Sequence, residues 1–248
     1  ALGQLIQVKS DDHGVKEKIK VTSFPVTGTI LLDGTPPVIA SSVTPTTHPF
    51  GWYRSDVSIT WTATDNLSGV AEISSPVTVS TEGAGQVFTG TAKDHAGNVA
   101  TSSVTINLDK TAPQITAIRN PLPNLHGWNN TNVVVSFEAT DSLSGIISVA
   151  PSIEVTTEGA NQIVQGVATD RAGNSASATV TIHIDQTPPQ ITSTVTPPAN
   201  PAGWHKSAIT VEFSALDGLS GLAELIPPAS TITTEGVGQE VSALGDER

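Results

Sequence analysis

The chain has 248 residues, of which 37% are hydrophobic and only 14% are charged, and it contains no cysteine and no methionine. The formal charge of -12 argues against nucleic acid or anionic membranes as partners, because a phosphate-binding surface needs clustered Lys and Arg. The missing cysteines exclude disulfides and thiolate zinc sites, and no run approaches the roughly 20 apolar residues that membrane insertion requires.

The first segment, residues 1–32, looks like the end of a domain. Residues 3–12 line up with residues 85–94, and residues 27–33 resemble residues 103–109. We therefore interpret the segment as the last two strands of a preceding domain or of a partner's domain. One explanation is a fragment of a longer array. The other is that the segment completes the third domain of the next molecule, which would build a filament by strand complementation.

From Asp33 onward the same pattern occurs three times. The motif D-x-T-x-P begins at Asp33, Asp109 and Asp185, which are 76 residues apart, and G-W and D-x-L-S-G follow with the same step. T-E-G follows at Glu82, Glu158 and Glu235, where the last step is 77 because the third repeat has one inserted residue. Such periodicity is typical of repeat proteins. The repeats are residues 33–108, residues 109–184 and residues 185–248. The third repeat is incomplete, because it lacks the motif D-x-A-G-N and the final strand that follows this motif in the other two.

Within each repeat the side chains alternate between apolar and polar. Val57, Ile59 and Trp61 alternate with Ser and Thr, which predicts a strand with one buried face. The other strands that we expect in the first repeat are residues 38–43, 70–74, 77–81, 86–93 and 99–108. Short strands at this spacing predict an all-β fold in which each repeat is a Greek-key sandwich of two antiparallel sheets.

The turn motif D-x-A-G-N lies between the last two expected strands. Gly97 and Gly173 are structural candidates, because glycine takes a positive φ without a clash and so forms the corner of a hairpin. The last strand of the first repeat runs to Leu108 and the next repeat opens at Asp109. Almost no linker remains, so we expect a linear array of sandwiches.

Taken together, D-x-T-x-P, G-W, A-T-D-x-L-S-G, T-E-G and D-x-A-G-N resemble the tandem bacterial Ig-like repeats of secreted and surface proteins. The resemblance covers Asp33 to about Val241, and the third repeat departs from it where Leu216 replaces Thr. It implies a non-catalytic stalk, extracellular or at the bacterial cell surface, that spaces or presents a partner domain. The alternatives are a filament subunit and a carbohydrate-binding or accessory module of a polysaccharide-degrading enzyme. The implied partners are neighbouring Ig-like domains, other copies of the chain and surface glycans.

Catalytic motifs are missing from the sequence. The six histidines do not recur at one repeat position, and the repeated Glu82, Glu158 and Glu235 follow Thr and precede Gly, which is a turn context. A small sandwich also lacks room for a deep cleft. We therefore predict no catalytic residue.

The carboxylates that recur at the turns are candidate metal ligands. Calcium binds about six to eight oxygens of Asp, Asn and backbone carbonyls, which a junction between two sandwiches can supply. The candidates are Asp65, Asp94, Asn98 and Asp109 for the first repeat and Asp141, Asp170, Asn174 and Asp185 for the second. The alternative is that each Asp only caps its turn.

The tryptophan of each G-W pair has two interpretations. If the tryptophans fill the core or cover the end of the sandwich, Trp128 and Trp204 are structural residues. In a sugar-binding platform, Trp52 with the adjacent Tyr53 is the best candidate for ligand binding.

Overall fold

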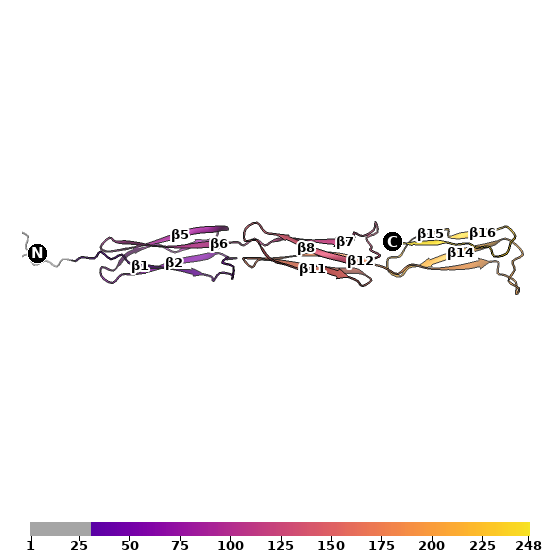
Figure 1. The fold of residues 1–248 in the computed structure, drawn as a ribbon, viewed down its shortest axis with the longest axis horizontal. Coiled ribbons are helices and arrows are strands. Elements are labelled where there is room, and N and C mark those ends of the chain that lie inside the picture. Colours follow the sequence, from indigo (N-terminus) through magenta and orange to yellow (C-terminus); the bar gives the residue numbers. More distant parts are fainter. Residues whose placement is uncertain (1–30) are drawn as a thin grey trace, which may run out of the picture. The chain divides into compact units, whose positions relative to one another are not determined.

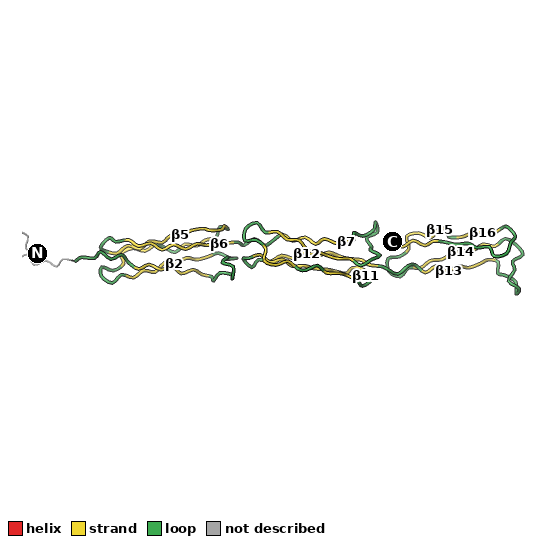
Figure 2. Tube along the Cα trace, viewed as in Figure 1, coloured by secondary structure: helices red, strands yellow, loops and turns green. Residues whose placement is uncertain are grey.

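The computed structural model describes residues 31–248, which form seventeen strands and no helix. The interpretation of residues 1–32 as two strands lies almost entirely outside the described residues. The strands gather into six small sheets (Figure 1), and the tube drawing shows loops between them (Figure 2). The protein is therefore all-β, as predicted. Among residues 31–248, none belongs to a helix that could cross a membrane.

The first repeat contains two three-stranded sheets, in the orders β1-β2-β4 and β3-β5-β6. Their strands are β1 (Val38–Thr44), β2 (Val57–Thr64), β3 (Val70–Ile73), β4 (Val77–Val79), β5 (Gly83–Asp94) and β6 (Val99–Leu108). All six lie where alternation and turn residues predict strands. The turn between β5 and β6 is also as expected, since Gly97 has a φ of 97° and the Asp94 amide donates to the Asn98 carbonyl.

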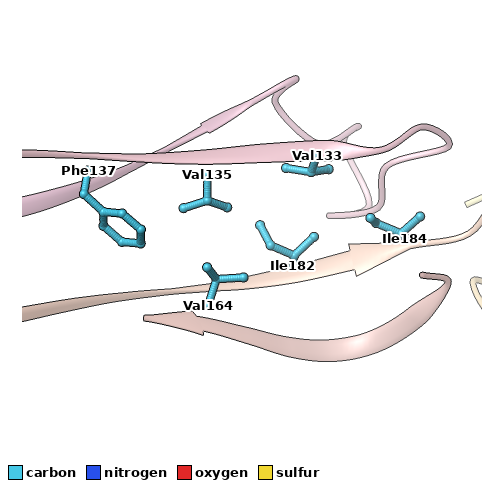
Figure 3. Close-up of a cluster of buried hydrophobic side chains, with 6 residues drawn as sticks. All are labelled: Val133, Val135, Phe137, Val164, Ile182 and Ile184. Atoms are coloured by element: carbon cyan, nitrogen blue, oxygen red, sulfur yellow. The ribbon is translucent and has the colours of Figure 1, made fainter. Parts of the chain in front are cut away.

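The second repeat has the same plan, with sheets β10-β8-β7 and β12-β11-β9. Its strands are β7 (Gln114–Asn120), β8 (Val133–Thr140), β9 (Ile146–Val149), β10 (Ile153–Val155), β11 (Gly159–Asp170) and β12 (Ser175–Ile184). The inward side chains of β8 pack against those of β11 and β12. Figure 3 shows this core, which consists of Val133, Val135, Phe137, Val164, Ile182 and Ile184. The two sheets thus enclose one apolar layer between them.

The third repeat contains the sheets β13-β14-β16 and β15-β17. Its strands are β13 (Gln190–Thr196), β14 (Ile209–Leu216), β15 (Leu222–Ile226), β16 (Ala229–Ile232) and β17 (Leu244–Glu247). β17 pairs with β15 as β5 pairs with β3 and β11 with β9. In this pairing, Glu247 occupies the strand position that Asp94 holds in the first repeat and Asp170 in the second.

The chain divides into two compact units, and the division passes through the strands of the first repeat. One unit comprises the described part of Ala1–Ser41 with Trp61–Ser75 and Thr89–Ser102, and the other comprises Ser42–Thr60, Pro76–Phe88 and Ser103–Arg248. The second unit therefore holds part of the first repeat together with all of the second and third. Each contact described below lies within one unit.

Candidate metal sites in three acidic triads

The carboxylates of each repeat converge into a triad. The triads are Asp33, Asp65 and Asp94; Asp109, Asp141 and Asp170; and Asp185, Asp217 and Glu247. Within each triad, one carboxylate oxygen per residue lies within 4.8 Å of the others. Each triad takes its first member from D-x-T-x-P and its second from D-x-L-S-G. Its third member stands at the end of β5, β11 or β17.

The central aspartate of each triad caps its own turn. Asp141 Oδ1 accepts the Leu143 amide at 3.1 Å and the Gly145 amide at 2.7 Å. Asp65 and Asp217 hold the equivalent amides in the same way. The aspartates of D-x-L-S-G therefore cap their turns. Capping occupies one oxygen, while Oδ2 of Asp141 accepts no hydrogen bond from the described residues.

The leading aspartate fastens the start of its repeat to that turn. Asp109 Oδ1 accepts the Thr111 amide at 3.0 Å, and Oδ2 accepts the Ser144 amide at 3.0 Å. Asp33 and Asp185 bond to the corresponding amides. The grouping of Asp109 with the first repeat is therefore corrected, since its side chain bonds to the D-x-L-S-G turn of the repeat that it opens.

The asparagines predicted as ligands act as hydrogen-bond donors. Asn174 Nδ2 donates to Asp170 Oδ2 at 2.8 Å and to the Asp109 carbonyl at 2.9 Å. Asn98 Nδ2 donates in the same way to Asp94 Oδ2 and the Asp33 carbonyl. Each asparagine thus holds two members of a triad in place.

Three triad members escaped the sequence analysis, and two sequence signals could have found them. Asp33 and Asp217 are in the same register as candidates already chosen. Glu247 follows Glu235 by twelve residues, as Asp94 follows Glu82, although its motif is otherwise lost. Comparing repeat positions at which one acidic residue replaces another would have revealed Glu247.

Negative charge is concentrated in these triads without a basic partner. Asp109 and Asp170 are fully buried, and the only ion pair among residues 31–248, Lys110 with Asp56 at 3.0 Å, lies outside the triads. Two ionised carboxylates at such separations repel by about 3 kcal/mol at an effective dielectric constant of 20. Burying charges of one sign is costly unless hydrogen-bond donors, a cation or a bound proton compensate them.

Backbone and side-chain donors favour the ionised form in the first triad. Hydrogen bonds from Ser68 and Thr35 lower the pKa of Asp33. Burial acts to raise the pKa of Asp94, but hydrogen bonds from Asn98 and Gly97 outweigh it and the pKa is lowered. Hydrogen bonding therefore favours the ionised forms of Asp33 and Asp94.

The third triad differs, because burial and the charges of Asp185 and Asp217 raise the pKa of Glu247. Glu247 Oε2 is buried and accepts no hydrogen bond from residues 31–248, and the same is true of Oδ1 of Asn129, which is 5% exposed. Asn129, Asp185 and Glu247 line one pocket. Buried acceptors without a donor are rare in folded proteins. A cation in this pocket would satisfy these oxygens and neutralise the carboxylates.

The aromatic candidates do not form a shared site. Tyr53 is buried at 8% exposure, and its backbone bonds to the end of β6, so its ring offers little surface to a sugar. Trp52 and Trp128 are half-buried, and Trp128 lies against His183 with ring centroids 5.3 Å apart. Trp204 is 58% exposed, unlike a core plug.

The T-E-G glutamates have a role that their turn context did not predict. Glu82 Oε1 accepts the backbone amide of Lys110, and Thr111 Oγ1 donates to the same carboxylate at 3.0 Å. Glu158 accepts from Gln186 and Thr187 in the same way, so Glu82 and Glu158 each belong to one repeat while their donors belong to the next. The signal was hidden because the two partners stand on either side of a repeat boundary. No protein-family model and no curated protein matches the chain.

Proposed function

We propose that the chain is a non-catalytic stalk of a bacterial extracellular or cell-surface protein, built from tandem Ig-like sandwiches that space or present a partner domain. The acidic triads would bind calcium and stiffen the stalk. One observation carries this proposal: the same triad recurs in every repeat, and in the second and third it adjoins the residues bonded to the preceding repeat.

The donor set favours calcium over other cations. All nine triad members are carboxylates, and hard oxygen ligands suit Ca²⁺ and Mg²⁺, whereas zinc and copper prefer nitrogen or sulfur. Calcium tolerates irregular ligand geometry and carboxylates that also accept hydrogen bonds. Magnesium demands a near-ideal octahedron and keeps several waters. The triads provide three carboxylates each, so waters or carbonyls would complete the coordination.

A calcium ion would act on the start of each repeat. The Asp109 amide donates to the Tyr53 carbonyl at 2.9 Å, so this residue lies where the first repeat leads into the second. An ion held by Asp109, Asp141 and Asp170 would tie this connection to two turns of the second repeat. The junction would lose freedom, and the stalk would become stiffer.

Thermal unfolding in calcium and in EGTA tests the proposal. Calcium at about 100 times its dissociation constant stabilises a folded site by about 2.7 kcal/mol, which for a domain of this size raises the Tm by about 5 °C or more. Asp141→Asn should remove most of the gain from the second repeat, because Asp141 is the one member of the second triad whose Oδ2 accepts no hydrogen bond from residues 31–248. In EGTA, the Asp141→Asn chain should keep most of its stability, because asparagine retains the Oδ1 atom that caps the turn.

Glu138→Gln is the matched control, since Glu138 is exposed on β8 and outside every triad. It removes the same charge and should leave the calcium gain unchanged. Equal Tm values in calcium and EGTA for the unmodified chain would overturn the proposed calcium sites. So would an equal loss of the gain in both variants.

A further inference from the structure

The contact between one repeat and the next is made twice with the same chemistry. Thr187 Oγ1 donates to Glu158 at 3.0 Å and the Gln186 amide donates to it at 2.6 Å. Glu82 receives the amide of Lys110 and the hydroxyl of Thr111 in the same way. We call this contact the glutamate latch. It joins the T-E-G loop of one repeat to the residues after the leading Asp of the next.

The third repeat carries the acceptor half of a further latch. Glu235 is exposed, and no described residue donates to its carboxylate. Its loop nevertheless has the conformation-fixing bond of the other two, because Gln239 Nε2 donates to the Thr234 carbonyl at 2.8 Å. Gln162 makes this bond to Thr157 at 2.8 Å. The backbone before Glu235 is therefore held by the same bond as in the other two repeats, which lowers the ordering entropy that binding a donor costs.

The first repeat carries the donor half. Gly34 and Thr35 follow Asp33 as Lys110 and Thr111 follow Asp109, and both are exposed. The Thr35 amide bonds to Asp33 Oδ1 at 3.0 Å, the same turn that the Thr111 amide forms with Asp109. The Gly34 amide and the Thr35 hydroxyl find no acceptor in residues 31–248.

A second contact supports the same pairing. Arg54 Nη1 of the first repeat donates to the Gly173 carbonyl of the second at 3.2 Å. In the third repeat Lys206, which is exposed, follows Trp204 by two residues as Arg54 follows Trp52. Gly97 is the counterpart of Gly173 in the first repeat. The cation and the carbonyl are thus available on the same two surfaces as the latch halves.

We propose that these two surfaces bind each other in different molecules, so that the chain associates head to tail with a second copy of itself. Glu235 of one copy would accept from Gly34 and Thr35 of the other. Trp204 and Val237, which are 58% and 79% exposed, would add apolar area. The interface is heterologous, so it propagates and does not close. It does not require calcium at the triads.

Sedimentation velocity of the full chain at rising concentration tests the proposal, with the average mass expected to grow. Glu235→Gln should weaken association about tenfold, since it removes a charged acceptor of two hydrogen bonds. Thr35→Val should weaken it as well, because the hydroxyl is lost at nearly constant volume. Glu240→Gln is the control, as Glu240 is exposed five residues away and should not alter association.

Mixing the two weakened variants gives a sharper result. The Thr35→Val chain retains Glu235 and the Glu235→Gln chain retains Thr35, so an equimolar mixture can form one intact latch. We expect dimers that grow no further. The proposal is overturned if the unmodified chain stays monomeric up to about 1 mM, where weak interfaces still associate. Equal effects of Glu235→Gln and Glu240→Gln, or a mixture no more associated than its components, would also overturn it.

Discussion

Glu247 and Asp94 occupy the same repeat position in opposite electrostatic settings. Burial and the charges of Asp185 and Asp217 raise the pKa of Glu247, whereas the hydrogen bonds from Asn98 lower that of Asp94. A carboxyl with a raised folded pKa binds protons more tightly when folded. Its stabilising contribution is present below the unfolded pKa and is lost as pH rises through the folded pKa.

We therefore expect Glu247→Gln to stabilise the protein in EGTA at pH 7, because glutamine avoids the unfavourable burial of a carboxylate beside Asp185 and Asp217 that raises the pKa of Glu247. The stabilisation should vanish near pH 4, below the ordinary glutamate pKa of 4.5, because both side chains are then neutral. Urea unfolding at the two pH values measures the difference, with Glu240→Gln as the exposed control. A loss of stability at pH 7 would contradict the electrostatic account of the third triad.

At the scale of the strand, a glycine of β11 makes room for an aromatic ring of β8. A Cβ added to Gly166 would lie 2.4 Å from Phe137 Cδ1, and one added to Gly90 would meet the Trp61 ring at 2.3 Å. Both aromatic side chains are buried at 8% exposure. Glycine within a strand often marks such a close approach.

Gly166→Ala should therefore destabilise the second repeat by about 1 to 3 kcal/mol, the usual penalty for overpacking a core. Chemical denaturation, monitored by a spectroscopic signal of Phe137 or by circular dichroism, measures the loss of stability. Gly218→Ala serves as control, because nothing lies within 4 Å of its added Cβ and its effect should stay within about 0.5 kcal/mol. Equal effects of the two changes would show that the ring does not need this space.

Strands could be predicted from the sequence, whereas the acidic triads could not. Strands such as Val57–Thr64 were readable because one buried face imposes a period of two. Membership of the triads was not, because Asp109 and Asp170 meet only after β11 and the leading segment have folded together. Asp109 also stands at a boundary, where sequence order does not say which repeat its side chain joins.

At the scale of the whole molecule, hydrogen bonds and an ion pair couple the first repeat to the second. Lys110 Nζ bonds to Asp56 at 3.0 Å and to the Ser80 carbonyl at 2.7 Å, and Glu82 holds the Lys110 amide. Single exposed contacts of this kind are weak. In repeat proteins such contacts act together with the folding of each unit. An ion at Asp109 would add a strong bond to the same segment.

Calcium binding stoichiometry, measured by calorimetric titration of the chelated full chain, tests the central claim most directly. The account predicts three sites per chain, one for each triad, and two sites after Asp141→Asn. Binding at the third triad should also release protons below neutral pH, since calcium displaces the proton that the raised pKa of Glu247 favours. Absence of binding heat at millimolar calcium, or three sites remaining in Asp141→Asn, would contradict it.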